Sequence, residues 1–360
     1  MSNTLKMCVF SDFHYRKFAY PGTLRDLDTI LNRAAENQVD FVIHAGDFCN
    51  NYHESPELKP AWLNNKYDLP VYGIYGNHEL ELMNHGHTEL DTEHPMQYVT
   101  PFLTNRADEV HWGTPDGKPA PYGEVAYYWF EKNGFRFLCT DTAYSQNTET
   151  GEWVHNPSLY TPKGNRPHEA LGEPQMTWME DVLMDAAKQG IPCIVFSHCP
   201  FTWDGMSGNH NEARDIFNRV NAYRKGTVVA VINGHQHTDS AKVMDNIVYF
   251  NVNSVINGCW IGGLDKHYTD EHTFTYTEYD NEGNPVKTYE RPYTALWQAE
   301  HGWFFDRPLS AIVTITEDGT VSVDGCEADW AYGIVPDESY LPENVKTGIT
   351  SGTYKMEREI

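Results

Sequence analysis

VYGIYGNHE, residues 71–79, joins an apolar run to a polar run. The apolar half has the composition of a short buried strand. The side chains of Asn77, His78 and Glu79 come directly after the glycine that ends this run. Because open α/β sheets bind their ligands at the carboxyl ends of the strands, the segment predicts a strand that delivers polar side chains to a binding site.

Four other apolar runs are followed by polar side chains in the same way. These runs are Cys8–Ser11, Phe41–Ala45, Ile194–Ser197 and Val228–Ile232. The candidate metal donors at the five strand ends are Asp12, His14, Asp47, Asn77, His198, His235 and His237. Imidazole, carboxylate and amide groups bind metals such as Zn, Fe and Mn. Seven donors are too many for one tetrahedral ion, and they suit two ions that share a bridging carboxylate.

The order of these motifs resembles that of the calcineurin-like metallophosphoesterase family. The resemblance rests on Asp12-x-His14, Gly46-Asp47, Gly76-Asn77-His78-Glu79, Ser197-His198 and Gly234-His235-x-His237. Two further motifs are Thr140-Asp141-Thr142 after a predicted strand and Gln175-x-x-Trp178 at the start of a predicted helix. Five motifs in one order, each after a strand, are far more specific than any one of them. The likeness covers the first two-thirds of the chain.

The resemblance implies an α/β fold, a calcineurin-like four-layer α/β/β/α sandwich of two mixed β-sheets flanked by helices. The alternation of predicted strands and helices supports the α/β class independently. We predict a metallophosphoesterase core in residues 1–258. Residues 259–360 are predicted to form a β-rich, aromatic C-terminal extension that packs on this core.

The resemblance also implies a role for each candidate residue, with two divalent ions (Mn, Fe or Zn) as cofactors. The implied ligands of the first ion are Asp12, His14, Asp47 and His237. The implied ligands of the second ion are Asp47, Asn77, His198 and His235. Asp47 would therefore bridge the two ions. The implied catalytic residues are His78 and Asp47, and Asn77 and His78 would bind the substrate.

The implied function is hydrolysis of a small phosphomonoester or phosphodiester by attack of a metal-bridging hydroxide. His78 would protonate the leaving group or hold a phosphoryl oxygen. Two alternatives stay open. One is a phosphodiesterase or nuclease that acts on nucleotides. The other is a non-catalytic metal-binding interaction module on the same fold, which binds a partner through its aromatic C-terminal segment.

Asn50 distinguishes this chain from two branches of the family. The protein-phosphatase branch has an Asp-Arg pair where this chain has Asn50-Asn51, so the carboxylate that pairs with the family's histidine is absent. The purple acid phosphatase branch has a tyrosine ligand at the position of Asn50. We therefore expect neither a Ser/Thr protein phosphatase nor a tyrosinate-coloured centre. His44 is expected to pack within its strand rather than bind metal.

The composition limits the partners of the protein. The formal net charge is -25, which argues against non-specific binding to nucleic acid or to an anionic membrane. No apolar run approaches the length of about 20 residues that a membrane span needs. The first strand is predicted almost at Met1, which leaves no room for a signal peptide, so we expect a cytoplasmic protein. A small phosphoester is the expected partner, and the sequence leaves the oligomeric state open.

Periodicity and turn residues predict the remaining elements. The predicted helices are Pro21–Glu36, Glu54–Asn65, Glu173–Lys188 and Glu212–Arg224. Predicted hairpins or strand pairs span Val125–Thr140, Ala241–Val252, Phe274–Tyr289 and Ala311–Asp324. The residues from Pro336 onward are expected to form a loosely ordered tail. Substrate specificity is expected to lie in loops 80–120, 144–172 and 200–213 and in the C-terminal segment.

Overall fold

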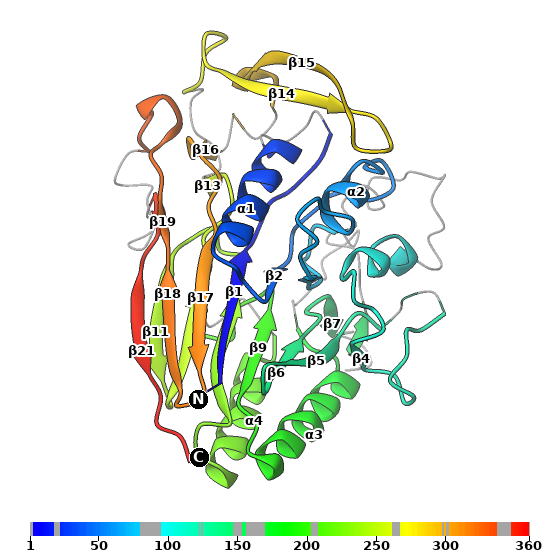
Figure 1. The fold of residues 1–360 in the computed structure, drawn as a ribbon, viewed down its shortest axis with the longest axis vertical. Coiled ribbons are helices and arrows are strands. Elements are labelled where there is room, and N and C mark those ends of the chain that lie inside the picture. Colours follow the sequence, from blue (N-terminus) through cyan, green and yellow to red (C-terminus); the bar gives the residue numbers. More distant parts are fainter. Residues whose placement is uncertain are drawn as a thin grey trace.

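The computed structural model describes most of the chain. The described residues are 3–17, 22–79, 95–121, 123, 125–146, 153–155, 170–202, 208–260, 267–296, 299, 302–336 and 347–359. Within them, two mixed β-sheets carry helices on their outer faces (Figure 1). The predicted α/β fold is confirmed.

The first sheet has six strands. Three neighbouring strands, which belong to the predicted series that ends in polar residues, are parallel to one another, and every pairing that involves the other three strands is antiparallel. In spatial order the strands are β21 (Gly352–Lys355), β18 (Thr320–Asp324), β17 (Ala311–Thr316), β1 (Thr4–Phe10), β2 (Phe41–His44) and β3 (Val71–Gly73).

The second sheet has seven strands, of which the four in the middle are parallel. In spatial order they are β11 (Ser240–Met244), β12 (Ile247–Asn251), β10 (Val228–Asn233), β9 (Cys193–Ser197), β6 (Phe135–Cys139), β5 (Tyr128–Lys132) and β4 (His111–Trp112). The predicted hairpin and the predicted strand pair in this part of the chain are confirmed.

The helices bury the apolar stripes that their sequence periodicity predicts. They are α1 (Leu24–Glu36), α2 (Leu58–Trp62), α3 (Glu173–Gln189) and α4 (His210–Tyr223), and α2 is shorter at both ends than the predicted helix Glu54–Asn65. Residues of α3 and α4 pack with residues of β6, β9, β10 and β12 in one apolar cluster. A larger apolar cluster includes residues of both sheets and of α1. The core therefore has two layers, one between the sheets and one beneath the α3–α4 pair.

The C-terminal segment forms four smaller elements beside the sandwich. β13 (Asn257–Trp260) pairs with β16 (Gly302–Phe304), and β14 (Thr273–Tyr279) pairs with β15 (Pro285–Pro292) in the predicted hairpin. Figure 1 shows this hairpin projecting above α1. Tyr268, Tyr293 and Phe304 pack in a separate small cluster within this segment, whereas Trp303, Phe305 and Trp330 pack in the main core.

Two short pairs complete the described strands: β7 (Tyr144–Gln146) with β8 (Trp153–His155), and β19 (Cys326–Glu327) with β20 (Gly348–Ile349). Single 3-10 turns lie at Pro95–Tyr98, Thr100–Phe102, Tyr293–Ala295 and Ala331–Gly333.

The end of the chain differs from the sequence-based expectation. The prediction of a loosely ordered tail from Pro336 is wrong for residues 347–359, because β21 pairs with β18 along Gly352–Lys355. The division of the chain at residue 258 stays a prediction. However, β17, β18 and β21 lie beyond that point and complete the six-stranded sheet, so the C-terminal segment also builds the sandwich.

Parts of the predicted specificity loops, including residues 80–94, 156–169 and 203–207, lie outside the described residues. In the part of the chain that is described, no helix combines the length and the apolar composition that crossing a bilayer requires.

Candidate metal centre

The predicted ligand segments are joined to one another beyond the ends of β1 and β2. The backbone N–H of Asp12 donates to the Gly46 carbonyl at 3.1 Å, and that of His14 donates to the Asp47 carbonyl at 2.8 Å. These bonds continue the parallel pairing of β1 and β2 past the regular strands. They place Asp12, His14 and Asp47 side by side at one edge of the sheet.

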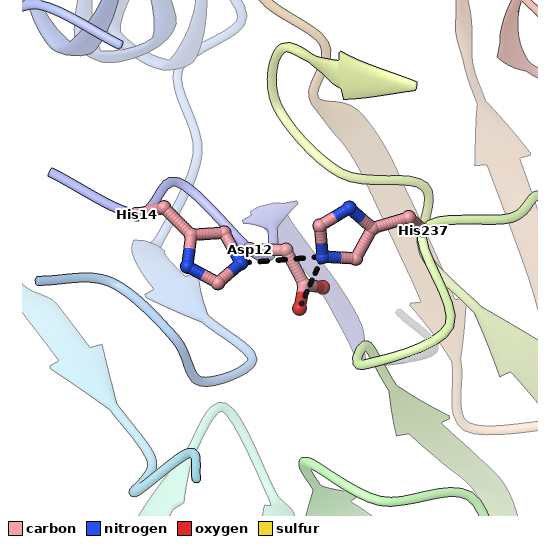
Figure 2. Close-up of side chains that lie close together, drawn as sticks. All are labelled: Asp12, His14 and His237. Atoms are coloured by element: carbon pink, nitrogen blue, oxygen red, sulfur yellow. Dashed lines mark hydrogen bonds and ion pairs between the residues drawn. The ribbon is translucent and has the colours of Figure 1, made fainter. Parts of the chain in front are cut away.

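One group of candidate ligands consists of Asp12, His14 and His237 (Figure 2). The Nε2 atoms of His14 and His237 are 3.2 Å apart, and His237 Nε2 is 3.4 Å from Asp12 Oδ1. All three side chains are buried. Two donors that are each about 2.1 Å from an ion lie about 3.0–3.4 Å from each other, so this spacing fits a shared cation. We call these three residues the first cluster.

A second cluster consists of Asp47, His198 and His235. His198 Nε2 lies 3.2 Å from Asp47 Oδ2 and 3.3 Å from His235 Nδ1. Asn77 completes this cluster, because its Oδ1 atom lies 2.9 Å from each of the two imidazole nitrogens. Its amide oxygen adds a donor without adding charge.

Asp47 lies between the two clusters. Its Oδ2 atom is 3.2 Å from His198 Nε2 and 3.8 Å from His14 Nε2, which belongs to the first cluster. The other carboxylate oxygen accepts a hydrogen bond from the backbone N–H of His78 at 2.8 Å. One oxygen of Asp47 therefore faces both clusters, which is a position that a bridging carboxylate can take.

Hydrogen bonds fix which nitrogen of two histidines faces the clusters. His198 Nδ1 lies 2.7 Å from the Ala45 carbonyl oxygen, and His14 Nδ1 lies 3.1 Å from Asn50 Oδ1. Carbonyl oxygens only accept, so in each neutral ring Nδ1 holds the proton and Nε2 presents a lone pair. The resemblance links the position of Asn50 to the family's catalytic histidine, whereas Asn50 Oδ1 here lies 3.1 Å from His14 Nδ1. Neither Asn50 nor Ala45 was predicted as an orienting group.

The carboxylates of both clusters are ionised without any metal. Burial opposes ionisation of Asp12, but His237 and His198 outweigh it and hold the pKa of that carboxyl at about 2. Burial also opposes ionisation of Asp47, and the neighbouring His198 and His78 hold its pKa well below the usual range. The site therefore has fixed negative charge in a buried place, which favours a cation.

The histidines differ in their affinity for protons. Burial lowers the pKa of His14 to about 4, so this ring is neutral and ready to bind metal. Burial also opposes protonation of His198, but Asp47 outweighs it and raises the pKa of that ring to about 10. Because a ligating imidazole must give up its proton at the donor nitrogen, a cation would displace this proton.

Five of the predicted ligands have backbones in the left-handed region. Their φ angles are 53° at Asp12, 50° at His14, 49° at Asp47, 72° at His235 and 51° at His237. This conformation costs roughly 1–2 kcal/mol for a residue with a Cβ atom. Such residues gather at binding sites, where the surrounding structure holds the strain. This observation marks the site independently of side-chain chemistry.

Two other residues of the motifs are buried behind the clusters. Glu79 accepts a hydrogen bond from the Phe48 backbone N–H at 3.1 Å, and burial together with Asp47 raises its pKa to about 8. The Gly76-Asn77-His78-Glu79 motif includes Glu79, but its local pattern does not predict this backbone contact. His44 is fully buried, and its ring stacks on that of Phe48 with the two ring centroids 4.5 Å apart. The expectation that His44 packs is confirmed.

His78 lies at the edge of the site. It is half-buried, and its ring centroid is 5.0 Å from that of His14. The structure thus places His78 beside the clusters rather than within either of them. Its catalytic and substrate-binding roles stay predictions, as do the ligand roles of the seven residues.

The donor set fits two divalent ions. Four imidazoles, two carboxylates and one amide converge, with one carboxylate oxygen between the clusters. The nitrogen and oxygen donors suit Zn, Fe or Mn.

Comparison with known proteins matched a family model and solved structures. A family model described as calcineurin-like phosphoesterase matches residues 5–239. The comparison with curated protein sequences gave no match. A dimetal phosphatase from Danio rerio has a similar structure, with a TM-score of 0.52 and 13% identity, over 91% of this chain and 99% of that chain. The GAP50 anchor of the Plasmodium inner membrane complex has a TM-score of 0.41 and 11% identity, over 99% of this chain and 90% of that one. At these identities, the first likeness supports the fold alone.

Proposed function

Because the chain belongs to the calcineurin-like phosphoesterase family, we propose that it is a dinuclear metal-dependent phosphoesterase that hydrolyses a small phosphomonoester or phosphodiester. The observation that carries the proposal is the position of Asp47 Oδ2, which faces His198 of one cluster and His14 of the other. Two donor groups that share a carboxylate are typical of enzymes that displace a group at phosphorus.

The residues of the site have separate tasks in this proposal. Asp12, His14 and His237 would hold one ion, and Asn77, His198 and His235 would hold the other, with Asp47 shared. Bound divalent ions supply positive charge to phosphoryl oxygens and lower the pKa of water. His78 would hold a proton for the leaving oxygen, from its place beside the first cluster. General acid help of this kind contributes about 10²–10⁴-fold to the rate.

The negative charge of the protein favours a small substrate over a polynucleotide. The formal net charge of -25 repels phosphate at long range, so attraction must come from the ions in the site. A nucleic acid would extend beyond the site onto this acidic surface. We therefore propose a small phosphoester as the substrate and either Mn, Fe or Zn as the metals.

The test combines metal analysis with turnover. The purified protein is analysed for bound metal and assayed with p-nitrophenyl phosphate and bis-p-nitrophenyl phosphate in the presence of Mn²⁺. Asp47→Asn is expected to lose nearly all turnover and to bind less metal. His78→Ala is expected to keep its metal and lose about 10²–10⁴-fold in kcat. His111→Ala, at an exposed histidine on β4, is the matched control and should leave both properties unchanged.

The outcomes separate the proposal from its alternatives. Two metals per chain, with hydrolysis of either ester that Asp47→Asn abolishes, support the phosphoesterase. Two metals without hydrolysis of any phosphoester in a broad panel support a non-catalytic metal-binding module. The dinuclear proposal is refuted by a folded protein that binds no divalent metal even after reconstitution.

A further inference from the structure

The turn that carries His235 and His237 joins β10 to β11 and has no regular secondary structure. Its two histidines have left-handed φ angles of 72° and 51°. A turn in this conformation keeps its shape only if other groups hold it. The backbone N–H of His235 donates to Asp12 Oδ2 at 2.9 Å, so the turn also touches a carboxylate of the first cluster.

Buried amides hold the inner side of this turn. Asn233 Nδ2 donates to Asn251 Oδ1, and Asn251 Nδ2 in turn donates to the carbonyl and hydroxyl oxygens of Thr238. Both asparagines are buried. Asn233 lies on β10 and Asn251 on β12. Both strands belong to the seven-stranded sheet, as does β11, to which the turn leads.

Another contact comes from the end of the chain. Asp239, two residues after His237, has an exposed fraction of 3%. Its Oδ2 atom accepts hydrogen bonds from the backbone N–H of Thr350 at 3.0 Å and from the Thr350 hydroxyl at 2.6 Å. A buried carboxylate needs such donors, because an unbonded charge in the interior is costly. Thr350 is more than one hundred residues away in the sequence.

The same C-terminal segment also reaches the chain beside Asp12. Asn253 Nδ2 donates to the Gly348 carbonyl at 3.1 Å, and Asn253 Oδ1 accepts from the backbone N–H of Ser254 at 2.9 Å. Ser254 forms a bridge with Ser11, the residue before Asp12. Residues 348–350 therefore contact Asp239, which lies two residues after His237, and reach Ser11 only through Asn253 and Ser254.

The C-terminal segment is itself anchored to the six-stranded sheet through β21. Gly348 and Ile349 pair with β19, and Gly352–Lys355 pairs with β18 in the six-stranded sheet. Asp239 follows a ligand that is carried by the seven-stranded sheet. The Asp239–Thr350 contact therefore joins the two sheets at the metal site.

We propose that residues 348–350 position the first metal cluster, with Thr350 acting through Asp239 on His237. This inference rests on the proposed dinuclear site. It assigns a positioning role to a part of the chain that lies beyond the residues matched by the family model. We expect that removing the Thr350 hydroxyl selectively lowers the binding affinity for one of the two metal ions.

The test uses the full chain and Mn²⁺ as the probe, titrated into metal-free protein. Thr350→Val keeps the side-chain shape and removes the hydroxyl, and it is expected to weaken one of the two binding steps about tenfold. Thr350→Ser restores a hydroxyl and should bind Mn²⁺ as the natural protein does. Thr353→Val is the matched control, because its hydroxyl contacts Ser322 and not the metal turn.

A second readout needs no metal. Hydrogen exchange at the amides of residues 236–239 is expected to be faster in metal-free Thr350→Val than in Thr350→Ser or Thr353→Val. Equal Mn²⁺ affinities and equal exchange in Thr350→Val and the natural protein would overturn the inference while leaving the proposed function intact. The inference would also be overturned if Thr350→Val and Thr353→Val lowered the Mn²⁺ affinity of both binding steps to the same extent, because that pattern indicates general destabilisation of the protein. Failure of the natural protein to bind Mn²⁺, Fe²⁺ or Zn²⁺ overturns both proposals.

Discussion

Gly46 illustrates how closely backbone and side chains approach each other at the site. A Cβ atom built on Gly46 would lie 2.3 Å from His198 Nδ1, the atom that is fixed by the Ala45 carbonyl. The φ angle of Gly46 is 94°, which residues with a Cβ atom rarely adopt. Glycine is therefore required here both for its conformation and for the position of His198.

Replacing Gly46 by alanine separates these two effects when a second glycine is used as the control. Gly46→Ala is expected to lower the free energy of unfolding by more than 1 kcal/mol and to weaken metal binding at least tenfold, because His198 must move. Gly333→Ala has a similar positive φ of 68° but no atom within 4 Å of the new Cβ. Gly333→Ala should lower the free energy of unfolding by about 1–2 kcal/mol and leave the metal affinity unchanged. Denaturant unfolding and metal titration measure both, and equal metal affinities in the two variants would contradict the steric argument.

His44 gives a prediction for pH dependence. Burial lowers the pKa of His44 to about 3, and the ring of an unfolded chain titrates near 6.5. Below pH 6.5 the unfolded state binds a proton that the folded state does not, so stability falls as the pH falls toward 3. The contribution of one such group is at most about 1.4 kcal/mol per pH unit.

The corresponding variant is His44→Phe, which keeps a ring against Phe48 and Trp62 and cannot be protonated. Its stability, measured by urea unfolding in the presence of a chelator, should fall less steeply between pH 6.5 and 3. The slope does not vanish, since His14 also has a pKa lowered by burial. Parallel pH curves for the variant and the natural protein would show that His44 does not titrate in this way.

At the scale of elements, α1 is fixed to the C-terminal strands by one side chain. Arg33 donates to the carbonyl oxygens of Ser310, Asp324 and Gly325, the last at 2.7 Å. These three acceptors lie at the ends of β17 and β18. The helix therefore stabilises the sheet beyond the contact of its apolar face.

Removing this guanidinium is expected to destabilise the fold. Arg33→Met keeps much of the aliphatic stem and should lower the free energy of unfolding by about 1.5–3 kcal/mol, because carbonyl groups lose a charged donor. Arg25→Met, at an exposed position on the same helix, should change it by less than about 0.5 kcal/mol. Urea unfolding of metal-free protein measures the difference. Equal stabilities of the two variants would assign no net stabilisation to the Arg33 contacts.

At the scale of the whole molecule, the last described residues join the two sheets at the end opposite the metal site. The backbone N–H of Met356 donates to the Gly319 carbonyl in the β17–β18 turn. Glu357 and Asn246, which lies in the β11–β12 turn, exchange two hydrogen bonds of 2.8 Å. The side chain of Met356 is fully buried in the main core.

Met356 tests whether this connection matters for stability. Met356→Ala is expected to lower the free energy of unfolding by about 2–5 kcal/mol, because it leaves a cavity between the sheets. Met356→Leu conserves the volume and should cost less than about 1.5 kcal/mol. Thermal and urea unfolding measure both variants. If Met356→Ala is no less stable than Met356→Leu, the end of the chain is not part of the cooperative core.

The sequence by itself determined the local elements and the chemistry of the site. Apolar periodicity predicted the strands and helices, because burial of one face repeats along a strand or helix. The glycines and polar residues after each strand predicted where chemistry would gather, since parallel strands end at the same edge of a sheet. Asp12, His14 and Asp47 were found in this way, each from its own short motif.

Only the tertiary structure decided which distant segments meet. It placed β17 beside β1, brought Asn50 to His14, and joined Asp239 to Thr350. Periodicity contains no information about such pairs, because it repeats over a few residues while these contacts depend on how whole strands are ordered in a sheet. The chemistry of the ligands is therefore local in the sequence, whereas the contacts that orient them result from the packing of the entire chain.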